Sequence, residues 1–154
     1  MNLPSTPSFS LENKRALIVG ASSGIGLACA VALAEYGASI TVAGRRSQKL
    51  EELSNSLKIK SINAELLELD ISKTDRIFQI INDLDPFDVL VNSAGIAKHS
   101  HSLETKEDDF DDVIGINLKG AYFLTMAVAR RLISAKKSGS LINISSQMGL
   151  VGGQ

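Results

Sequence analysis

The feature that most constrains the fold is an alternation of short apolar runs with longer segments of helical pattern. The expected strands are almost wholly apolar and cover residues 16–19, 39–43, 66–69, 89–91 and 141–144. Helical patterns lie between them, and the last and longest covers about residues 110–135. Strands without a polar face, separated by helices, favour a parallel sheet covered on both sides. Because such crossovers are right-handed, we predict an α/β fold with a doubly wound parallel sheet.

Local signals predict where the helices begin and end. The first helix is expected to open near Gly24 and to stop at Gly37, a usual C-terminal glycine. Ser47 can cap the second helix, and residues 72–75 resemble a capping box with Asp in place of the usual Glu. A chain of 154 residues suits one domain. We expect a loose leader at 1–13 and the domain at 14–154.

Composition excludes several kinds of protein. The hydrophobic fraction is 44% and the charged fraction 21%, which favours a packed core over disorder. The net charge of -1 offers no basic excess for nucleic acid or an anionic membrane. The longest apolar run, residues 27–34, is too short to cross a bilayer, and the N-terminus does not resemble a signal peptide. With a single cysteine, Cys29, we expect a soluble protein of a reducing compartment, the cytoplasm.

The turn after the first expected strand runs from Gly20 to Gly26 and reads GASSGIG. Gly20 allows a sharp turn, Gly24 lets the backbone approach a pyrophosphate, and Gly26 lets the helix pack close to the sheet. Exposed N–H groups at the start of the helix can then hold phosphate. The spacing differs from the G-x-G-x-x-G form of many dinucleotide folds. Small residues between a strand and a helix also occur for packing alone.

Four motifs, in order, resemble those of the short-chain dehydrogenase/reductase family. The glycine turn is similar to the family's TGxxxGIG, with Val19 in the place of Thr. Residues 92–95 (NSAG) resemble its NNAG motif, with Ser93 replacing the second Asn. Asn117 lies where the family's catalytic Asn interrupts a long helix, and residues 143–146 (NISS) resemble the end of its fifth strand. The resemblance covers nearly the whole chain and implies the N-terminal portion of a Rossmann fold, truncated after the fifth strand.

The resemblance implies a nicotinamide dinucleotide as cofactor. NAD-binding members place an acid after the second strand, where it accepts from the ribose 2'-hydroxyl. Here Gly44 stands in that place, followed by Arg45 and Arg46. Without the carboxylate, an Arg fork can pair with a 2'-phosphate, so we expect NADP(H) rather than NAD, with Arg45 as the leading contact. Alternatively, both arginines belong to a solvated loop.

Further cofactor contacts are implied after the third and fourth strands. By resemblance, Asp70 accepts from the adenine amino group, assisted by the backbone of Ile71; alternatively Asp70 is an acid that complements a helix dipole. Asn92, Ala94 and Gly95 would line the floor beneath the adenosine ribose, and Asn92 would also hold neighbouring strands together. The implied cofactor-binding residues are Gly20, Ser22, Ser23, Gly24, Ile25, Gly26, Arg45, Arg46, Asp70, Ile71, Asn92, Ala94 and Gly95.

The family's chemistry is hydride transfer between nicotinamide and a carbonyl or alcohol. The resemblance makes Ser146 the serine that polarises the substrate oxygen, with Ser145 as runner-up, and makes Asn117 the residue that holds a relay water. Taken alone, serines at a strand end or a polar residue on a helix need no catalytic role. The family's acid/base Tyr, assisted by Lys, begins a YxxxK motif about a dozen residues beyond the serine. Neither Tyr36 nor Tyr122 is followed four residues later by Lys.

Three functional hypotheses remain open. In the first, the chain is an NADP(H)-dependent oxidoreductase that is active only with a C-terminal part carrying the Tyr/Lys pair. In the second, it is a truncated, non-catalytic dinucleotide-binding module. In the third, it is a structural subunit that pairs its fifth strand and its long helix with a partner. We expect a small-molecule carbonyl or alcohol as substrate, and no nucleic-acid or membrane partner. We also expect a homo-oligomer, because family members commonly pair through this long helix. His99 and His101 have no third ligand in view, so no metal site is expected, although both are candidates to touch substrate.

Overall fold

A computed structural model describes residues 7–151 of the chain. These residues form one sheet of parallel strands in the order β3-β2-β1-β4-β5. The strands are β1 (Arg15–Val19), β2 (Ser39–Gly44), β3 (Ala64–Glu68), β4 (Val89–Asn92) and β5 (Ser140–Asn143). The order reverses between β1 and β4, so the predicted doubly wound parallel sheet is confirmed.

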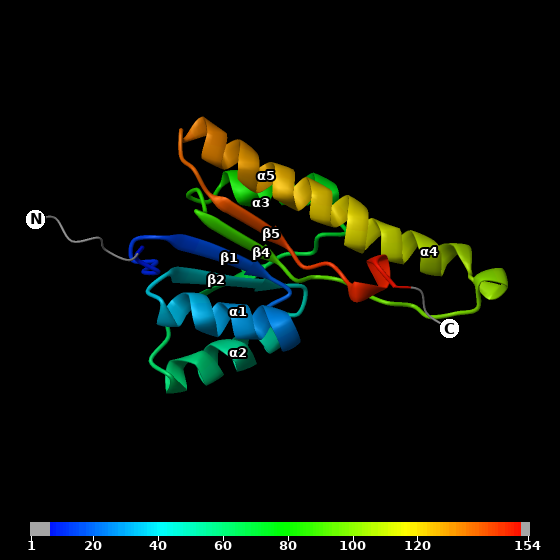
Figure 1. Cartoon of the computed structure of the whole chain (residues 1–154), viewed down its shortest axis with the longest axis horizontal. Helices are drawn as coiled ribbons and strands as arrows, with labels where there is room; N and C mark the ends of the chain where they lie inside the picture. The colour runs from blue at the N-terminus through cyan, green and yellow to red at the C-terminus, as the bar shows by residue number, and fades with distance from the viewer. Residues whose placement is uncertain (1–6, 152–154) are drawn as a thin grey trace, which may run out of the picture.

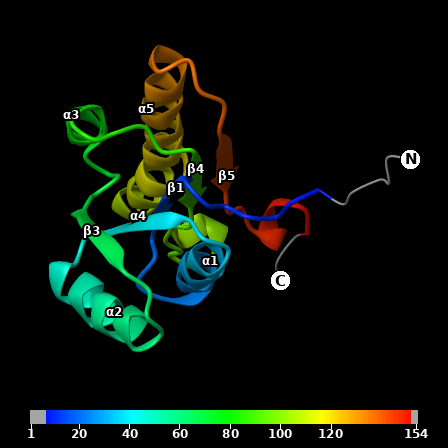
Figure 2. The same ribbon diagram turned by 90° about the vertical axis from the view of Figure 1, so that its left-hand side faces the viewer.

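Helices cover both faces of the sheet (Figure 1 and Figure 2). The helices α1 (Gly24–Glu35) and α2 (Ser47–Ile59) lie on one face, and α3 (Thr74–Asn82) and α5 (Ala121–Ser134) on the other. The remaining helical segments are η1 (Ser102–Glu104), α4 (Glu107–Ile114), the π-helix η2 (Gly115–Gly120) and η3 (Gln147–Gly149). No helix within residues 7–151 is long and apolar enough to span a membrane.

The side chains of β1 divide the core into two layers. Ala16 and Ile18 pack with the buried residues of α1 and α2, whereas Leu17 and Val19 pack with those of α3 and α5. This division follows from the two-residue period of a strand. All four side chains are at most 1% exposed, which explains why a central strand has no polar face in the sequence.

The bounds of β3 differ from those predicted. The strand covers residues 64–68 instead of 66–69, and it lies at the edge of the sheet. Glu65 and Glu68 are exposed there, so the strand includes charged residues that an apolar run excludes. Leu69 is buried but follows the strand, with its backbone N–H bonded to the carbonyl of Gly44.

Both serine caps predicted from the sequence are wrong. Ser47 is the first residue of α2, and the cap position belongs to Arg46, without a side-chain hydrogen bond. The third helix begins at Thr74 after Lys73, again without a side-chain cap. The backbone N–H of Ser72 donates instead to the carboxylate of Asp70, at 3.0 Å, and closes the turn after β3.

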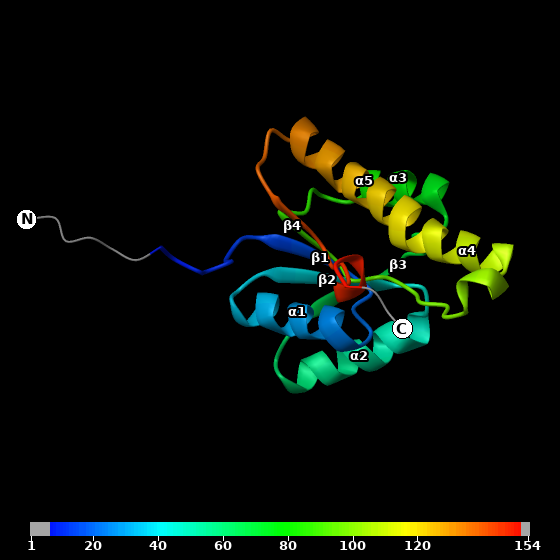
Figure 3. The ribbon, with the colours of Figure 1, turned by 45° about the vertical axis from the view of Figure 1, so that its right-hand side comes forward.

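The long helix is continuous from α4 through η2 to α5 (Figure 3). The long helix begins at residue 107, whereas the sequence predicts a start near 110. The three acidic residues before Phe110 form its first turn. Negative side chains at that end complement the positive end of the helix dipole. A π-helical turn, η2, lies in the middle of this helix and contains Asn117, where the resemblance implies an interruption.

The predicted leader is partly anchored. The backbone N–H of Leu11 donates to the carbonyl of Tyr36 at 2.7 Å, and Leu11 packs against the core layer beneath α1 and α2. Residues 7–13 contain no helix or strand. The first six residues of the leader, and residues 152–154 of the predicted domain, lie outside the described residues.

Candidate functional site

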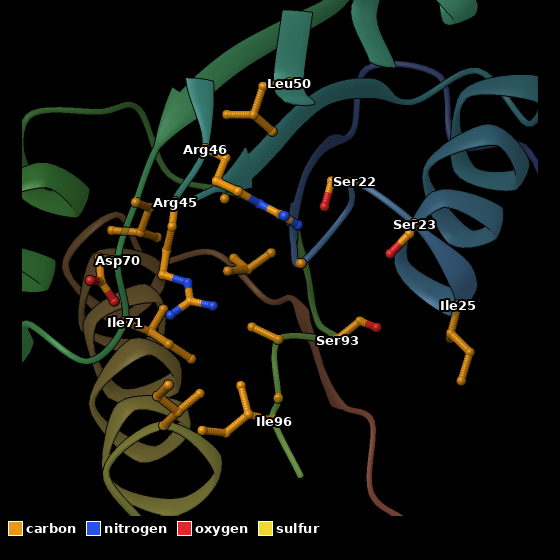
Figure 4. A pocket seen from close by; sticks show the side chains of 17 residues that line it. Ser22, Ser23, Ile25, Arg45, Arg46, Leu50, Asp70, Ile71, Ser93 and Ile96 are labelled. Atoms are coloured by element: carbon orange, nitrogen blue, oxygen red, sulfur yellow. The ribbon is translucent and has the colours of Figure 1, made fainter. Parts of the chain in front are cut away.

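A cavity of about 330 Å³ opens at the carboxyl end of the sheet. Its walls come from the turn after β1 and from the loops after β2, β3 and β4, which are far apart in sequence (Figure 4). Crevices at this edge of a doubly wound sheet are its usual ligand sites. Of the predicted cofactor residues, those that line it are Gly20, Ser22, Ser23, Ile25, Arg45, Arg46, Asp70, Ile71, Ala94 and Gly95.

Gly20 is required by its surroundings as well as by its backbone. Its φ angle is +80°, and a Cβ atom there would lie 2.6 Å from the amide nitrogen of Ala94. A side chain would therefore push the loop after β4 out of place. Gly26 is buried behind the turn, and its Cβ would lie 2.9 Å from the carbonyl carbon of Gly20. These two glycines let the turn, the loop and α1 approach one another closely.

The start of α1 is open toward a ligand. Gly24 has a φ angle of +57°, and a Cβ atom there would meet nothing within 4 Å. Ser23 occupies the cap position but makes no side-chain cap hydrogen bond, and the first turn of α1 contains no acid. The free N–H groups and the positive end of the helix dipole thus favour an anion at this place.

Arg45 and Arg46 extend over the cavity from the end of β2 (Figure 4). Both are exposed, and within residues 7–151 neither forms an ion pair with a carboxylate. Asp70 lines the same cavity, while its Oδ1 accepts the backbone N–H of Ser72. The cavity therefore presents two cations that have no anionic partner in the described part of the chain, with one carboxylate nearby.

Asn92 lies behind the cavity wall and not in its lining. The side chain is 3% exposed, its Nδ2 donates to Oδ1 of Asn143 at 3.0 Å, and its Oδ1 accepts from the backbone N–H of Ala94 at 3.2 Å. These bonds join the ends of β4 and β5 and shape the loop that follows. The expected strand-joining role of Asn92 is thus present, whereas Ser93 occupies the lining.

The two predicted catalytic residues are not part of the cavity lining. Asn117 lies in η2, where its Oδ1 accepts from the backbone N–H of Ile96 at 2.9 Å and its Nδ2 donates to the carbonyl of Ile96 at 2.8 Å. Ser146 is exposed after β5, and its Oγ accepts from the backbone N–H of Met148 at 3.2 Å. Among residues 7–151 no hydrogen bond joins Asn117 to Ser146.

Part of the acidic stretch at the start of α4 is engaged in ion pairs. Nζ of Lys98 lies 2.6 Å from Asp109 and 2.7 Å from Asp112, so the loop after β4 is tied to the helix. The hydrogen bond to Asp109, with that to Asp112, raises the pKa of Lys98. The same hydrogen bond lowers the pKa of the Asp109 carboxyl below its usual range. His99 and His101, which follow Lys98, are exposed.

Sequence reasoning missed most of the apolar lining. These residues are adjacent to strand ends or lie on helices, where an apolar side chain also fits the core. Ser93 departs from the family's NNAG motif, and a replaced residue within such a motif is a usable signal of a site residue. The missed lining residues are Val19, Gly44, Leu50, Leu69, Ser93, Ile96 and Ile116.

Comparison with known proteins gives close relatives over most of the chain. Gluconate 5-dehydrogenase of Gluconobacter oxydans is 34% identical over 142 residues, covering 90% of this chain and 55% of that protein. The 3-oxoacyl-[acyl-carrier-protein] reductase FabG of Rickettsia prowazekii is 36% identical, covering 92% and 57%. The chain therefore spans a little over half the length of the curated relatives it matches.

The fold matches solved structures as well. A crystal structure of a gluconate 5-dehydrogenase from Burkholderia cenocepacia, in complex with NADP and tartrate, superposes with a TM-score of 0.87 at 31% identity, covering 95% of this chain and 58% of that one. The family model for short chain dehydrogenases matches residues 14–154, which contain the glycine turn, the NSAG segment and the strand end before Ser146. The chain thus belongs to the short-chain dehydrogenase family.

Proposed function

We propose that this chain binds NADP(H) and is the cofactor-binding part of an oxidoreductase that transfers hydride to or from a carbonyl or alcohol substrate. The observation that carries the proposal is the cavity at the carboxyl end of the sheet. There the open start of α1 and the two arginines after β2 face the same space. The relative solved with NADP supports the choice of cofactor. Residues 14–154 are proposed as the binding domain, preceded by the leader 1–13.

The residues present fit a dinucleotide with a 2'-phosphate. The backbone N–H groups at Gly24 and Ile25 are proposed to hold the pyrophosphate, because no Cβ blocks the approach. Arg45, with Arg46, would pair with the 2'-phosphate, and Gly44 brings no competing carboxylate. Asp70 would accept from the adenine amino group. The bound nicotinamide supplies or takes up the hydride, and this chain holds and orients it.

For the substrate side we propose that Ser146 polarises the substrate oxygen through Oγ. Asn117 has used one side-chain N–H and one oxygen lone pair on Ile96. One N–H and one lone pair remain, enough to hold the relay water assigned to it by resemblance. Ser146 already accepts one backbone hydrogen bond, but its hydroxyl hydrogen stays free to donate to a substrate oxygen.

The proton in this chemistry needs a Tyr with a neighbouring Lys, and no tyrosine of these 154 residues has Lys four residues later. We therefore propose that the 154-residue chain alone binds the cofactor without turning over substrate. A non-catalytic dinucleotide-binding module is the alternative for the protein as a whole. The two differ in whether turnover appears when the Tyr and Lys are supplied on a longer chain.

Self-association through the long helix is a further part of the proposal. Phe110 is 58% exposed and Leu118 and Tyr122 are each 62% exposed, and all three lie on the continuous helix α4–η2–α5. Large apolar side chains at this exposure favour an interface, here with a second copy. Ile142 on β5, a strand at the edge of the sheet, is also 44% exposed. The cytoplasmic location stays a prediction.

The proposal is tested by following NADPH oxidation with a panel of ketones, keto acids and acyl thioesters. With the 154-residue chain we expect saturable NADPH binding and no oxidation above the buffer rate. Oxidation that depends on both substrate and protein would contradict the need for the Tyr/Lys pair. Absence of dinucleotide binding would contradict the proposal itself.

A further inference from the structure

The π-helical turn η2 contacts two segments of the cavity wall. On one side, Asn117 binds both backbone groups of Ile96. On the other side, Gly120 packs against Ile71, which follows β3. Ile71 and Ile96 both line the cavity, and Figure 4 shows them beside the same helix. One short turn therefore touches the loops after β3 and after β4 at the same time.

The two atoms nearest to a side chain at Gly120 would be main-chain atoms of Ile71. A Cβ atom at this position would lie 2.5 Å from the carbonyl oxygen of Ile71 and 3.0 Å from its carbonyl carbon. Main-chain atoms cannot rotate aside as the end of a flexible side chain can, so any side chain at Gly120 would displace the loop. Ile71 is 3% exposed and has core on its other side, so the displacement would have to move it within the cavity wall.

The helix gives no conformational reason for glycine at this position. Gly120 has φ and ψ angles of -61° and -45°, which every residue adopts in a helix. Glycine inside a helix lowers helix stability relative to alanine. Space for Ile71 is the reason that the structure provides for this glycine.

We propose that Gly120 is a positioning residue for the cofactor: by lacking a side chain, it sets the place of the Asp70–Ile71 wall against which the adenine end would bind. This inference rests on the proposed NADP(H) function. This wall is a tight turn held by two hydrogen bonds to Asp70. The backbone N–H of Ser72 donates to the Asp70 carboxylate at 3.0 Å, and the backbone N–H of Lys73 donates to the main-chain carbonyl of Asp70 at 3.1 Å. Displacement of Ile71 should disturb both bonds.

Gly115 provides a matched control at the other end of the same π-helical turn. It also has helical angles, with φ at -58° and ψ at -41°, but a Cβ atom there would meet nothing within 4 Å. Gly115→Ala and Gly120→Ala therefore make the same chemical change on the same turn. They differ in whether a wall of the cavity must move.

The test compares wild type, Gly120→Ala and Gly115→Ala by calorimetric titration with NADPH and by amide hydrogen exchange at Ser72 and Lys73. For Gly120→Ala we expect NADPH binding to be weaker by about tenfold or more, because small displacements of binding groups greatly reduce affinity. We also expect faster hydrogen exchange at the amides of Ser72 and Lys73. Gly115→Ala should keep NADPH affinity within about twofold of wild type, as expected for a substitution without new contacts.

Three results would overturn the inference: wild-type affinity in Gly120→Ala, an equal loss in Gly115→Ala, or a Gly120→Ala protein that fails to fold while Gly115→Ala folds. A Gly120→Ala protein that does not fold would show that the Gly120–Ile71 contact is needed for the whole fold and does not only position the cavity wall. If the wild type binds no dinucleotide, the proposed function fails separately. The amide hydrogen-exchange rates then test the effect of Gly120 on the wall without a cofactor. Unchanged exchange at Ser72 and Lys73 in Gly120→Ala would refute the positioning role.

Discussion

Replacing Arg45 by alanine should change the choice between NADPH and NADH. Arg45 lines the cavity from the end of β2 and has no carboxylate partner among residues 7–151, so its guanidinium is available to a phosphate. A hydrogen bond to a charged group contributes about 1.5–3 kcal/mol. Because Arg45 is exposed, water weakens the pairing, and we expect about 1.5–2 kcal/mol. That corresponds to about 10- to 30-fold weaker NADPH binding.

NADH carries no 2'-phosphate, so its affinity should stay within about twofold of wild type. Isothermal titration of each cofactor into wild type and Arg45→Ala measures the change in both affinities. Lys58→Ala is the matched control, since it also removes an exposed cation, from the last turn of α2, but from a residue outside the cavity lining. The reasoning is refuted if Arg45→Ala leaves NADPH affinity unchanged, or if NADH loses as much as NADPH.

Three further substitutions test other parts of the site and fold. Gly44→Asp places a carboxylate where a 2'-phosphate is proposed to bind, and the new Cβ would lie 3.6 Å from its nearest neighbour, an ordinary contact distance. Calorimetric titration should find NADPH binding weaker and NADH binding stronger than in wild type. A gain in NADPH affinity would contradict the assignment. Gly26→Ala would place a Cβ 2.9 Å from the carbonyl carbon of Gly20. Chemical denaturation should therefore find the free energy of unfolding lowered by about 1–3 kcal/mol. An unchanged free energy of unfolding would show that the backbone of the turn moves to accommodate the methyl group. Lys98→Met removes the hydrogen-bond donor that contributes most to the lowered pKa of Asp109, so an NMR titration should find the pKa of the Asp109 carboxyl higher than in wild type. In wild type the Asp109 interaction is therefore present above pH 3.8 and lost as the pH falls through the lowered pKa, and an Asp109 pKa that stays low in Lys98→Met would contradict this cause.

The central part of the fold could be predicted from the sequence because burial on both faces leaves a clear pattern. The expected strand at 16–19 is observed at 15–19, and the expected strand at 89–91 is observed at 89–92. The edge strand β3 was misplaced because one edge and much of its surface face water, so charge is tolerated in it. The starts of the second and third helices differ from those predicted because Ser47 is itself the first residue of α2 and the backbone N–H of Ser72 closes the turn after β3.

The glycine turn could be predicted for a related reason. Positive φ angles at Gly20 and Gly24 restrict the residue type, so the conformation leaves its mark in the sequence. Gly120 has an ordinary helical φ angle, and the atoms that exclude a side chain belong to a residue 49 positions earlier, Ile71. Asn117 was identified by resemblance, but its binding to Ile96 joins residues 21 positions apart and depends on the tertiary fold. Local pattern does not contain such contacts.

An NMR titration of the isotope-labelled chain with NADPH shows whether the cavity at the carboxyl end of the sheet binds this cofactor. We expect saturable shifts of backbone amides concentrated at residues 23–26, Arg45 and Ile71, with smaller shifts for an equal concentration of NADH. Amides on the far side of the molecule, such as that of Ser39 at the opposite end of β2, should stay in place. If saturating NADPH causes no shifts at the glycine turn and Arg45, or causes its largest shifts near Ser39, this cavity is not the NADPH site.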